Sequence, residues 1–399
     1  MAETGIGKRT IRDVGVRDKT VLVRADLNVP LEDGRIADDA RIRASLPTIQ
    51  YLRERNARVV LCSHLGRPKG KPHPDMSLRV VGERLAQLLG EPVAFAEDCV
   101  GSLARTAIDD SANGVVLLEN LRFHAGEEAN DPAFAEQLAA LAQLYVNDAF
   151  GAAHRAHAST SAIARFLPAV AGLLLESEVK YLGALIADPP RPFAAIIGGA
   201  KVSSKIDAVR HLLPKVDLML IGGGMANTFL VAQGFSIGKS LLEPDLVETA
   251  KQVNAEAART GKRLLLPVDA VVAPAPAEDA VPAVVAIDSI PDDQLILDIG
   301  PRTVSSFVEA LRDMKGVVWN GPMGVFEMPA FAKGSYALAH AVADLDATTV
   351  VGGGETAQLV GEAGVSQRIT HVSTGGGASL EMLEGKPLPG VEALEDMPK

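Results

Sequence analysis

The sequence predicts an α/β protein with two domains, each a parallel sheet flanked by helices. Short apolar runs alternate with amphipathic stretches along the chain, and this alternation is typical of parallel strands joined by crossover helices. The length of 399 residues exceeds what one hydrophobic core usually holds, so two domains are expected. A cluster of Pro189, Pro190 and Pro192 marks the boundary between the two halves.

In the first half, strands are expected at residues 21–23, 57–61, 115–118 and 144–146. A helix is expected from a cap at Ser77 to just before Gly90, since Ser favours the start of a helix and Gly its end. Another is expected at residues 131–144, because it opens with Asp-Pro, which suit the cap and the first helical position. Residues 173–187 also have a helical pattern, and a single helix that joins two domains is suited to act as a hinge.

The second half repeats one local plan, in which an apolar strand runs into two or three glycines and then into a helix. The glycines lie at residues 198–199, 222–224, 352–354 and 375–377. The strands before them are expected at 193–197, 218–221, 348–351 and 371–373, and the helices after them at 201–213, 225–232, 355–362 and 378–383. A fifth strand, at residues 316–319, ends at Asn320, and parallel strands that end at one edge form a ligand-binding crevice there. Residues 271–291 hold no helical pattern and are expected to form an extended excursion or a small subsheet, without an assigned function.

Composition excludes several classes of protein. The formal net charge of −11 argues against a nucleic-acid or anionic-membrane partner. Two cysteines, Cys62 and Cys99, are too few for a disulfide framework and fit a reducing cytosol, so a cytoplasmic location is expected. The first residues contain no apolar run typical of a signal peptide, and no stretch approaches the ~20 apolar residues of a membrane span.

The repeated glycine junctions favour a nucleotide site in the second half. Backbone N–H groups at a helix N-terminus suit phosphate oxygens, and glycine lets the backbone approach them closely. For one junction alone, tight packing is the better explanation, and it is the repetition that favours a ligand. No junction matches the P-loop pattern or the G-x-G-x-x-G dinucleotide fingerprint, so a nucleotide would bind by another arrangement.

Lys201 and Lys205 are four residues apart, which predicts one shared face in the first turn of a helix that begins near Val202. Two positive charges at that end oppose the helix dipole. A bound phosphoryl group would reverse this unfavourable term, so a phosphate clamp is preferred over two solvated lysines.

The first half instead carries arginines and histidines beside turns, which suit the phosphate or carboxylate of a small substrate. They are Arg24, Arg41, His64, Arg67, Arg122, His154, Arg155 and His157. His64 alone is better explained by a structural hydrogen bond, but Arg67 in the same turn favours anion binding. Asp26 and Asn28 lie on one side of an extended segment, and a turn cap explains them as well as a ligand role does. The two halves together predict a two-lobed phosphoryl-transfer enzyme.

At these residues the chain strongly resembles the phosphoglycerate kinase family over essentially its whole length. The blocks that carry the resemblance occur in the family's order: VRADLNVP, SHLGRP, LLENLRFHAGEEAND, VNDAFGAAHRAHAST, IIGGAKVSSKI, LIGGGMANTFL, WNGPMGVFE, VVGGG and HVSTGGGASLEMLEGK. The resemblance implies a monomer of two Rossmann-like lobes, each with a parallel sheet flanked by helices, joined by a hinge helix across a cleft. It implies a phosphoglycerate-binding domain at residues 1–172, a hinge and linker at 173–188, a nucleotide-binding domain at 189–380, and a segment at 381–399 that returns to the first domain.

The resemblance also assigns roles to individual residues. Those implied for binding 3-phosphoglycerate or 1,3-bisphosphoglycerate are Asp26, Asn28, Arg41, His64, Arg67, Arg122 and Arg155. Those implied for binding Mg-ADP or Mg-ATP are Lys205, Gly222, Gly223, Leu241, Gly300, Asn320, Pro322, Gly324, Glu327, Gly353, Gly354, Glu355 and Thr356. Those implied for catalysis are Arg41, Lys201, Lys205 and Gly376.

Two positions depart from the family pattern. Glu355 stands where the Gly-Gly-Gly block is usually followed by Asp, so its carboxylate is one methylene further out. Mg²⁺ tolerates little geometric error, so Glu355 is expected to ligate the ion either directly or through a water. Ser204 replaces an Asp before the second lysine, which removes a negative charge.

The expected reaction is reversible transfer of a phosphoryl group between 1,3-bisphosphoglycerate and ADP, giving 3-phosphoglycerate and ATP. Both nucleophiles, a carboxylate and a phosphate oxygen, are already anionic near neutral pH, so no general base is required. Two alternatives remain. A nucleotide-dependent oxidoreductase is disfavoured by the missing fingerprint, and a catalytically impaired nucleotide-binding protein is favoured only by Glu355.

Overall fold

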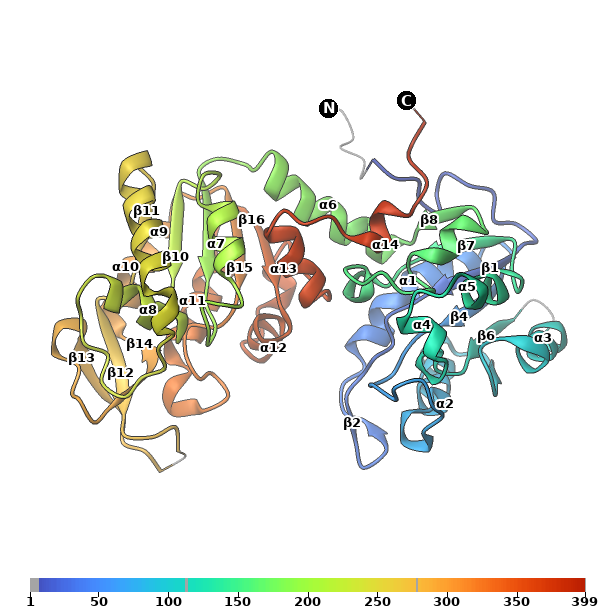
Figure 1. Cartoon of the computed structure of the whole chain (residues 1–399), viewed down its shortest axis with the longest axis horizontal. Helices are drawn as coiled ribbons and strands as arrows, with labels where there is room; N and C mark the ends of the chain where they lie inside the picture. Colours follow the sequence, from blue (N-terminus) through green and yellow to red (C-terminus); the bar gives the residue numbers. More distant parts are fainter. Residues whose placement is uncertain (1–6, 112–113, 278, 399) are drawn as a thin grey trace. The chain divides into compact units, whose positions relative to one another are not determined.

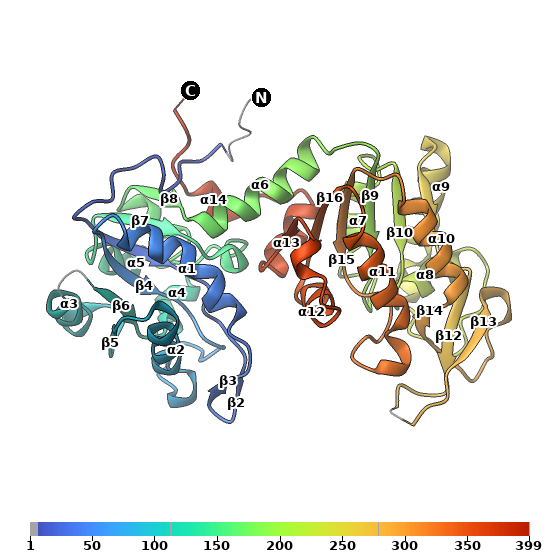
Figure 2. The same ribbon diagram turned by 180° about the vertical axis from the view of Figure 1, so that it is seen from behind.

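The computed structural model describes residues 7–111, 114–277 and 279–398, and the chain divides into two compact units (Figures 1 and 2). Unit 1 comprises residues 1–180 together with 387–399, and unit 2 comprises residues 181–386. Each unit contains one six-stranded parallel sheet with helices against it, which confirms the predicted α/β class. No helix in the described part of the chain is long and apolar enough to cross a membrane.

The sheet of unit 1 has the strand order β5-β6-β4-β1-β7-β8. Its strands are β1 (Thr20–Arg24), β4 (Arg58–Cys62), β5 (Val93–Ala96), β6 (Val115–Leu118), β7 (Leu144–Asn147) and β8 (Ala169–Ala171). The helices are α1 (Ala40–Arg53), α2 (Arg79–Leu89), α3 (Gly101–Asp110), α4 (Ala125–Glu128) and α5 (Pro132–Ala139), with a short hairpin of β2 (Leu31–Glu32) and β3 (Arg35–Ile36). The central strands are mostly apolar because helices cover both faces of a parallel sheet, and polar residues such as Arg24 and Asn147 stand at the ends of β1 and β7.

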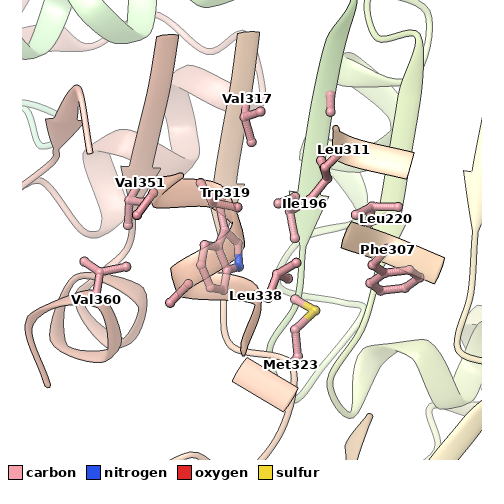
Figure 3. Close-up of a cluster of buried hydrophobic side chains, with 14 of the residues drawn as sticks. Ile196, Leu220, Phe307, Leu311, Val317, Trp319, Met323, Leu338, Val351 and Val360 are labelled. Atoms are coloured by element: carbon pink, nitrogen blue, oxygen red, sulfur yellow. The ribbon is translucent and has the colours of Figure 1, made fainter. Parts of the chain in front are cut away.

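The sheet of unit 2 has the strand order β11-β10-β9-β15-β16-β17. Its strands are β9 (Phe193–Ile197), β10 (Leu218–Ile221), β11 (Arg263–Leu265), β15 (Gly316–Asn320), β16 (Thr348–Gly352) and β17 (His371–Val372). The helices are α7 (Ile206–Leu212), α8 (Met225–Ala232), α9 (Val247–Thr260), α10 (Pro301–Leu311), α11 (Lys333–Ala343), α12 (Gly354–Glu362) and α13 (Gly377–Leu383). Figure 3 shows part of the core, where Trp319 and Ile196 from the sheet pack with Leu338 and Phe307 from α11 and α10.

A small antiparallel sheet lies in unit 2, with the order β13 (Ala283–Ala286), β12 (Asp269–Ala273) and β14 (Leu295–Ile299). It agrees with the small subsheet expected around residues 271–291. Its antiparallel pairing sets it apart from the parallel sheet beside it.

Helix α6 (Leu173–Ala187) has the bounds that the helical pattern predicted, and the division between the units falls within it. The end of the chain, which includes α14 (Pro389–Glu392), belongs to unit 1. Ion pairs join Lys8 Nζ to Asp396 Oδ1 at 2.7 Å and Arg9 NH1 to Glu395 Oε2 at 2.7 Å. The amide of Asn147, at the end of β7, donates to the carbonyl oxygen of Gly390 at 2.9 Å.

Three predicted helix boundaries are wrong. Helix α5 ends at Ala139 because the chain must reach β7, where Leu144 pairs with Val21. Helix α2 begins at Arg79 rather than directly after Ser77, whose hydroxyl donates to Glu119 while also accepting from the N–H of Arg79.

The third error concerns the lysine pair. The predicted helix at 201–213 begins only at Ile206, so Lys201 and Lys205 share no helical face. The N–H of Gly199 donates to the carbonyl oxygen of Pro322 at 2.9 Å, and the carbonyl of Gly199 accepts from the N–H of Met225. These hydrogen bonds hold the segment after β9 against neighbouring loops, so the helix begins only after it.

Candidate active site

Asp26, Asn28 and Arg41 meet where the chain leaves β1. One nitrogen of Arg41, in the first turn of α1, donates to both carboxylate oxygens of Asp26, at 3.2 and 3.1 Å, and to the carbonyl oxygen of Asn28 at 3.2 Å. The Asn28 side-chain oxygen accepts from the N–H of Gly66 at 2.9 Å, which ties this segment to the turn after β4. The Arg41 side chain keeps 36% of its surface exposed, so part of its guanidinium can still meet an anion.

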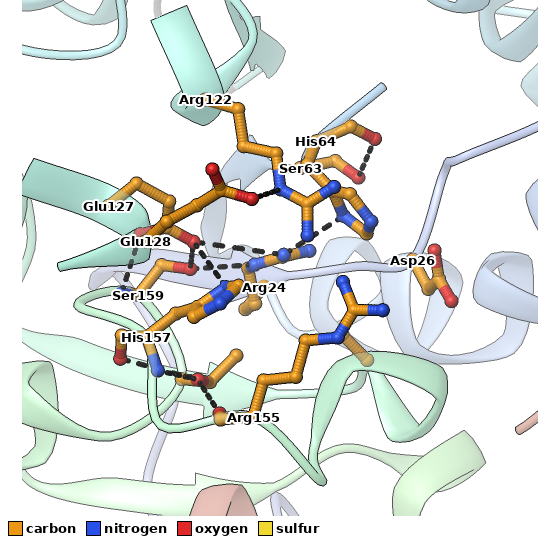
Figure 4. A network of polar contacts seen from close by, with 12 residues as sticks. Arg24, Asp26, Ser63, His64, Arg122, Glu127, Glu128, Arg155, His157 and Ser159 are labelled. Atoms are coloured by element: carbon orange, nitrogen blue, oxygen red, sulfur yellow. Dashed lines mark hydrogen bonds and ion pairs between the residues drawn. The ribbon is translucent and has the colours of Figure 1, made fainter. Parts of the chain in front are cut away.

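His64 and Arg122 follow the ends of β4 and β6, and both lie close to the buried side chain of Arg24 (Figure 4). Arg122 donates to the carbonyl oxygen of Gly66 at 2.8 Å. Its Nε lies 3.1 Å from a carboxylate oxygen of Glu128, which forms an ion pair. Burial lowers the pKa of His64 well below its usual value, and neighbouring arginines lower it further, Arg24 first. His64 is therefore neutral near pH 7.

The loop after β7 brings Arg155, His154 and His157 to the same region. The Nε of Arg155 donates to the Nε2 of His154 at 3.1 Å. The pKa of His157 falls to about 4 because of burial and then the charge of Arg122. Arg67 is exposed in the turn at Gly66. The structure thus gathers arginines at the carboxyl ends of neighbouring parallel strands, as an anion-binding patch requires.

The glycine junctions of unit 2 pack against one another. A methyl group on Gly198 would overlap with the carbonyl oxygens of Pro322 and Gly321, and one on Gly222 would overlap with the sulfur of Met323. Gly223, at φ +67°, lies against the backbone of Gly199, with only 2.7 Å from the position of a Cβ to the Gly199 nitrogen. Tight packing is therefore a sufficient reason for these three glycines.

Two other glycines have no such neighbour. At Gly354, the first residue of α12, and at Gly376, just before α13, no heavy atom of the described chain beyond the adjoining residues and the helix backbone lies within 4 Å of where a Cβ would stand. Gly376 has a φ of +43°, a left-handed conformation that favours glycine. The space beside these glycines is open to a ligand.

Lys205 is a half-buried cation of unit 2. Its ammonium donates to the side-chain oxygen of Asn320 at 2.6 Å and to the carbonyl oxygen of Asn320 at 3.1 Å. Burial lowers its pKa to about 8, while the charge of Glu355 acts in the opposite direction. Lys201, by contrast, is exposed.

A pocket of about 390 Å³ opens beside these loops. Six predicted nucleotide residues line it: Gly223, Leu241, Pro322, Gly324, Glu327 and Glu355. Gly224 and Val325 also line it, and the resemblance implies nucleotide binding for the whole stretches 222–224 and 324–327. Residues that sequence reasoning missed line it too: Gly199, Ala200, Asn227, Pro276, Leu295, Ile296, Leu297, Asp298 and Met323. Leu295, Ile296 and Leu297 come from β14, and the apolar run of that strand gave no indication of a ligand.

The other predicted nucleotide residues do not line the pocket. They are Lys205, Gly222, Gly300, Asn320, Gly353, Gly354 and Thr356. Some of them support it. Gly300 caps α10 and packs against the carboxylate of Asp269, and the hydroxyl of Thr356 accepts from the N–H of Gly321 at 2.6 Å.

Glu355 is compatible with a magnesium site. It is exposed at the start of α12, next to the open space at Gly354. Mg²⁺ is usually held by one or two carboxylates together with substrate phosphates and waters, so a single protein carboxylate suffices. Within the described residues, the group close enough to hold an ion by itself is Asp98, Cys99 and His124 of unit 1. In that group His124 already contacts Asp98 at 2.7 Å.

The comparisons with known proteins agree with this arrangement. A model of the phosphoglycerate kinase family matches residues 11–386. The chain is 57% identical over 392 residues to the phosphoglycerate kinase of Pelotomaculum thermopropionicum, covering 98% of this chain and 100% of that protein. It is 56% identical over 392 residues to the phosphoglycerate kinase of Moorella thermoacetica, with the same coverage. Among solved structures, it superposes on the phosphoglycerate kinases of Coxiella burnetii (TM-score 0.87, 41% identity, 97% of this chain and 98% of that one) and Pyrococcus horikoshii (TM-score 0.85, 34% identity, same coverage).

Proposed function

The chain belongs to the phosphoglycerate kinase family, and we propose that its two units each bind one reactant. The enzyme is a phosphotransferase with a carboxyl group as acceptor, and it transfers a phosphoryl group reversibly between 1,3-bisphosphoglycerate and ADP. The family uses ATP and ADP as co-substrates. The observation that supports this division is that the two units carry different kinds of anion-binding group. Unit 1 has clustered arginines, and unit 2 has a pocket bordered by strand-end glycines.

In unit 1 the phosphoglycerate would lie against the arginine patch. Its anionic groups would bind to Arg41, Arg67, Arg122 and Arg155, with His64 as a further donor. Asp26 and Asn28 would hold the hydroxyl and carboxyl end. The Asp26 carboxylate supports this because it already orients Arg41 through two hydrogen bonds.

In unit 2 the nucleoside would occupy the pocket. The apolar side chains of Leu295 and Leu297 suit a base, and the carboxylate of Glu327 suits the ribose hydroxyls. Phosphates would extend toward Lys205 and the open spaces at Gly354 and Gly376. A phosphate beside Lys205 would raise the pKa of its ammonium, which burial lowers to about 8 in the free protein.

Glu355 would hold Mg²⁺, directly or through a water, together with the phosphates. When bound, the ion would supply positive charge that offsets the negative charge of the phosphate chain.

The residues of the chain would accelerate transfer by alignment and charge neutralisation. Arg41, Lys201 and Lys205 would stabilise charge on the phosphoryl oxygens in flight, and no residue needs to remove a proton. Because each reactant would bind to a different unit, transfer requires the two bound reactants to meet. A hinge motion at α6, within which the division between the units falls, would bring the reactants together. Closure of the units would also exclude water from the phosphoryl group.

We further infer that the enzyme works as a cytoplasmic monomer without nucleic-acid or membrane partners. The net charge of −11 supports the absence of polyanionic partners. Sedimentation of the purified chain would test its oligomeric state, and a mass of twice 41.8 kDa would contradict the monomer.

A coupled assay tests the function directly. Purified enzyme should consume ATP in the presence of 3-phosphoglycerate, and activity should fall on removal of Mg²⁺ by a chelator and return when Mg²⁺ is restored. Nucleotide binding without turnover would indicate the catalytically impaired alternative.

A further inference from the structure

A chain of buried polar groups runs beneath the arginine patch of unit 1, from Glu127 through Ser159 and Arg24 to His64 (Figure 4). The hydroxyl of Ser159 donates to a carboxylate oxygen of Glu127 at 2.6 Å and accepts from Nε of Arg24 at 2.8 Å. The N–H of Ser159 donates to the other oxygen of Glu127 at 2.9 Å. At the far end, NH2 of Arg24 contacts Nδ1 of His64 at 3.1 Å.

The contact between Arg24 and His64 determines which ring nitrogen carries the proton. A guanidinium only donates hydrogen bonds, so Nδ1 of His64 must accept. A neutral imidazole whose Nδ1 accepts carries its proton on Nε2. Among the described residues, Nδ1 is the nitrogen of this ring that has a hydrogen-bond partner, which leaves Nε2–H to donate to a ligand.

The surroundings of His64 favour its neutral form. The ring is buried, and four arginines lie near enough for their positive charges to disfavour a second proton on it: Arg24, Arg122, Arg155 and Arg41. A proton on Nδ1 would also place two donors against each other at the contact with Arg24.

Glu127 is the group on which this arrangement depends. Its side chain and that of Arg24 both have 0% exposure, and a carboxylate oxygen of Glu127 lies 4.0 Å from NH2 of Arg24. A buried arginine without a counter-charge is strongly destabilised where it lies. Without the charge of Glu127, the guanidinium of Arg24 would be more stable beside a substrate anion or in solvent. Its hydrogen bond to Nδ1 of His64 would then be lost.

We propose that Glu127 is a positioning residue: acting through Ser159 and Arg24, it fixes His64 as the neutral tautomer that donates Nε2–H to an anionic oxygen of the phosphoglycerate. The choice of ligand rests on the function proposed above, while the tautomer is a property of the free enzyme. The proposed ligand and the proposed tautomer can therefore be disproved independently of each other.

The first test is nitrogen NMR of the histidine rings in the substrate-free enzyme. The chain has 8 histidines, and a His64→Ala spectrum identifies the signals of His64. The wild-type enzyme should show His64 with its proton on Nε2, and Glu127→Gln should give a mixture of tautomers. Glu119→Gln is the matched control, because Glu119 is another buried carboxylate of unit 1, and it accepts from the hydroxyl of Ser77 and the N–H groups of Leu78 and Asn120. It should leave the His64 signals unchanged.

The second test is kinetic. Glu127→Gln should raise KM for 3-phosphoglycerate roughly tenfold, the scale of one weakened hydrogen bond to a charged group, and leave KM for ATP unchanged. In a His64→Ala background the same substitution should raise KM much less, since the residue through which it acts is already gone. If Glu127→Gln does not fold, as judged by circular dichroism, Ser159→Ala breaks the same chain while retaining both charges.

Two results would overturn the proposal. One is an unchanged His64 tautomer in a folded Glu127→Gln or Ser159→Ala enzyme. The other is an equal rise in KM with and without His64, which would indicate a merely structural role. If the wild-type enzyme did not use 3-phosphoglycerate at all, the proposed function would fail, and the NMR result would still decide the role of Glu127.

Discussion

Lys205 and Lys201 have the same side chain in different environments. The ammonium of Lys205 is held by Asn320 at the end of β15, whereas Lys201 is exposed. Because neither residue lies in a helix turn shared with the other, their contributions to catalysis depend on local contacts rather than on helical spacing.

We expect Lys205→Ala to lower kcat at least ~100-fold without unfolding, the scale of losing one donor to the transition state. Steady-state kinetics with circular dichroism as a folding check would measure this. Lys251→Ala is a suitable control, because Lys251 lies on α9 and pairs at the surface with Glu248. Near-normal turnover in Lys205→Ala would remove Lys205 from the catalytic set.

Arg41→Ala should also lower kcat at least ~100-fold, because the structure holds this guanidinium against Asp26 in an orientation that leaves it partly exposed to an anion. The same assay applies. A purified, folded Arg41→Ala enzyme with close to wild-type kcat would contradict the proposed role.

Asp148 should make stability depend on pH. It is buried at the end of β7, accepts from the N–H groups of Leu174 and Leu175 at the start of α6, and its second oxygen has no partner in the described part of the chain. Burial raises its pKa from 3.8 to about 7. Since the folded pKa lies above the unfolded one, its contribution to stability is present below about pH 4 and is lost as the pH rises through about 7.

We therefore expect Asp148→Asn to become more stable relative to the wild type as the pH rises from about 4 to about 7. The slope for one proton is at most ~1.4 kcal/mol per pH unit. Urea unfolding of both proteins at several pH values would measure it. A difference in unfolding free energy that stays constant with pH would show that Asp148 is ionised in the folded state.

At the scale of elements, the glycine junctions have similar sequences but different surroundings in the fold. Those after β9 and β10 allow three strand-end loops to pack on one another, whereas Gly354 and Gly376, at the starts of α12 and α13, border open space. Gly-Gly after an apolar run predicted a strand-to-helix junction in each case. Which glycine faces protein and which faces a ligand depends on neighbours far away in the chain.

A matched pair of substitutions tests this difference. Gly198→Ala should destabilise unit 2 by about 1–3 kcal/mol, because its methyl group would overlap with backbone oxygens that cannot easily move. Gly354→Ala should leave the thermal midpoint nearly unchanged, since nothing lies within 4 Å of the new methyl group, but it should raise KM for ATP. Calorimetry and steady-state kinetics would measure the two effects. An unchanged KM in Gly354→Ala would place the phosphates elsewhere.

At the scale of the whole molecule, the two units should respond to different ligands. Trp319 is the single tryptophan of the chain and lies fully buried in the core of unit 2, so its fluorescence reports on that unit (Figure 3). Mg-ADP should raise the midpoint of the Trp319 unfolding transition, because at a concentration 100 times its Kd it adds ~2.7 kcal/mol to the free energy of unfolding. 3-Phosphoglycerate alone should raise it much less. A larger shift with 3-phosphoglycerate than with Mg-ADP would reverse the assignment of ligands to units.

The sequence by itself determined the alternation of strands and helices, the parallel pairing, the bounds of α6 and the kinds of side chain at the strand ends, because these follow from short-range periodicity and residue chemistry. Only the tertiary structure decided that the half-buried Lys205 is held by Asn320 while Lys201 is exposed, and that β14 supplies the apolar wall of the pocket. It likewise decided that Arg24 is turned inward onto Ser159 and His64, near Glu127. These contacts join residues that are distant along the chain, and packing of the strand ends selects them without leaving a local signal in the sequence.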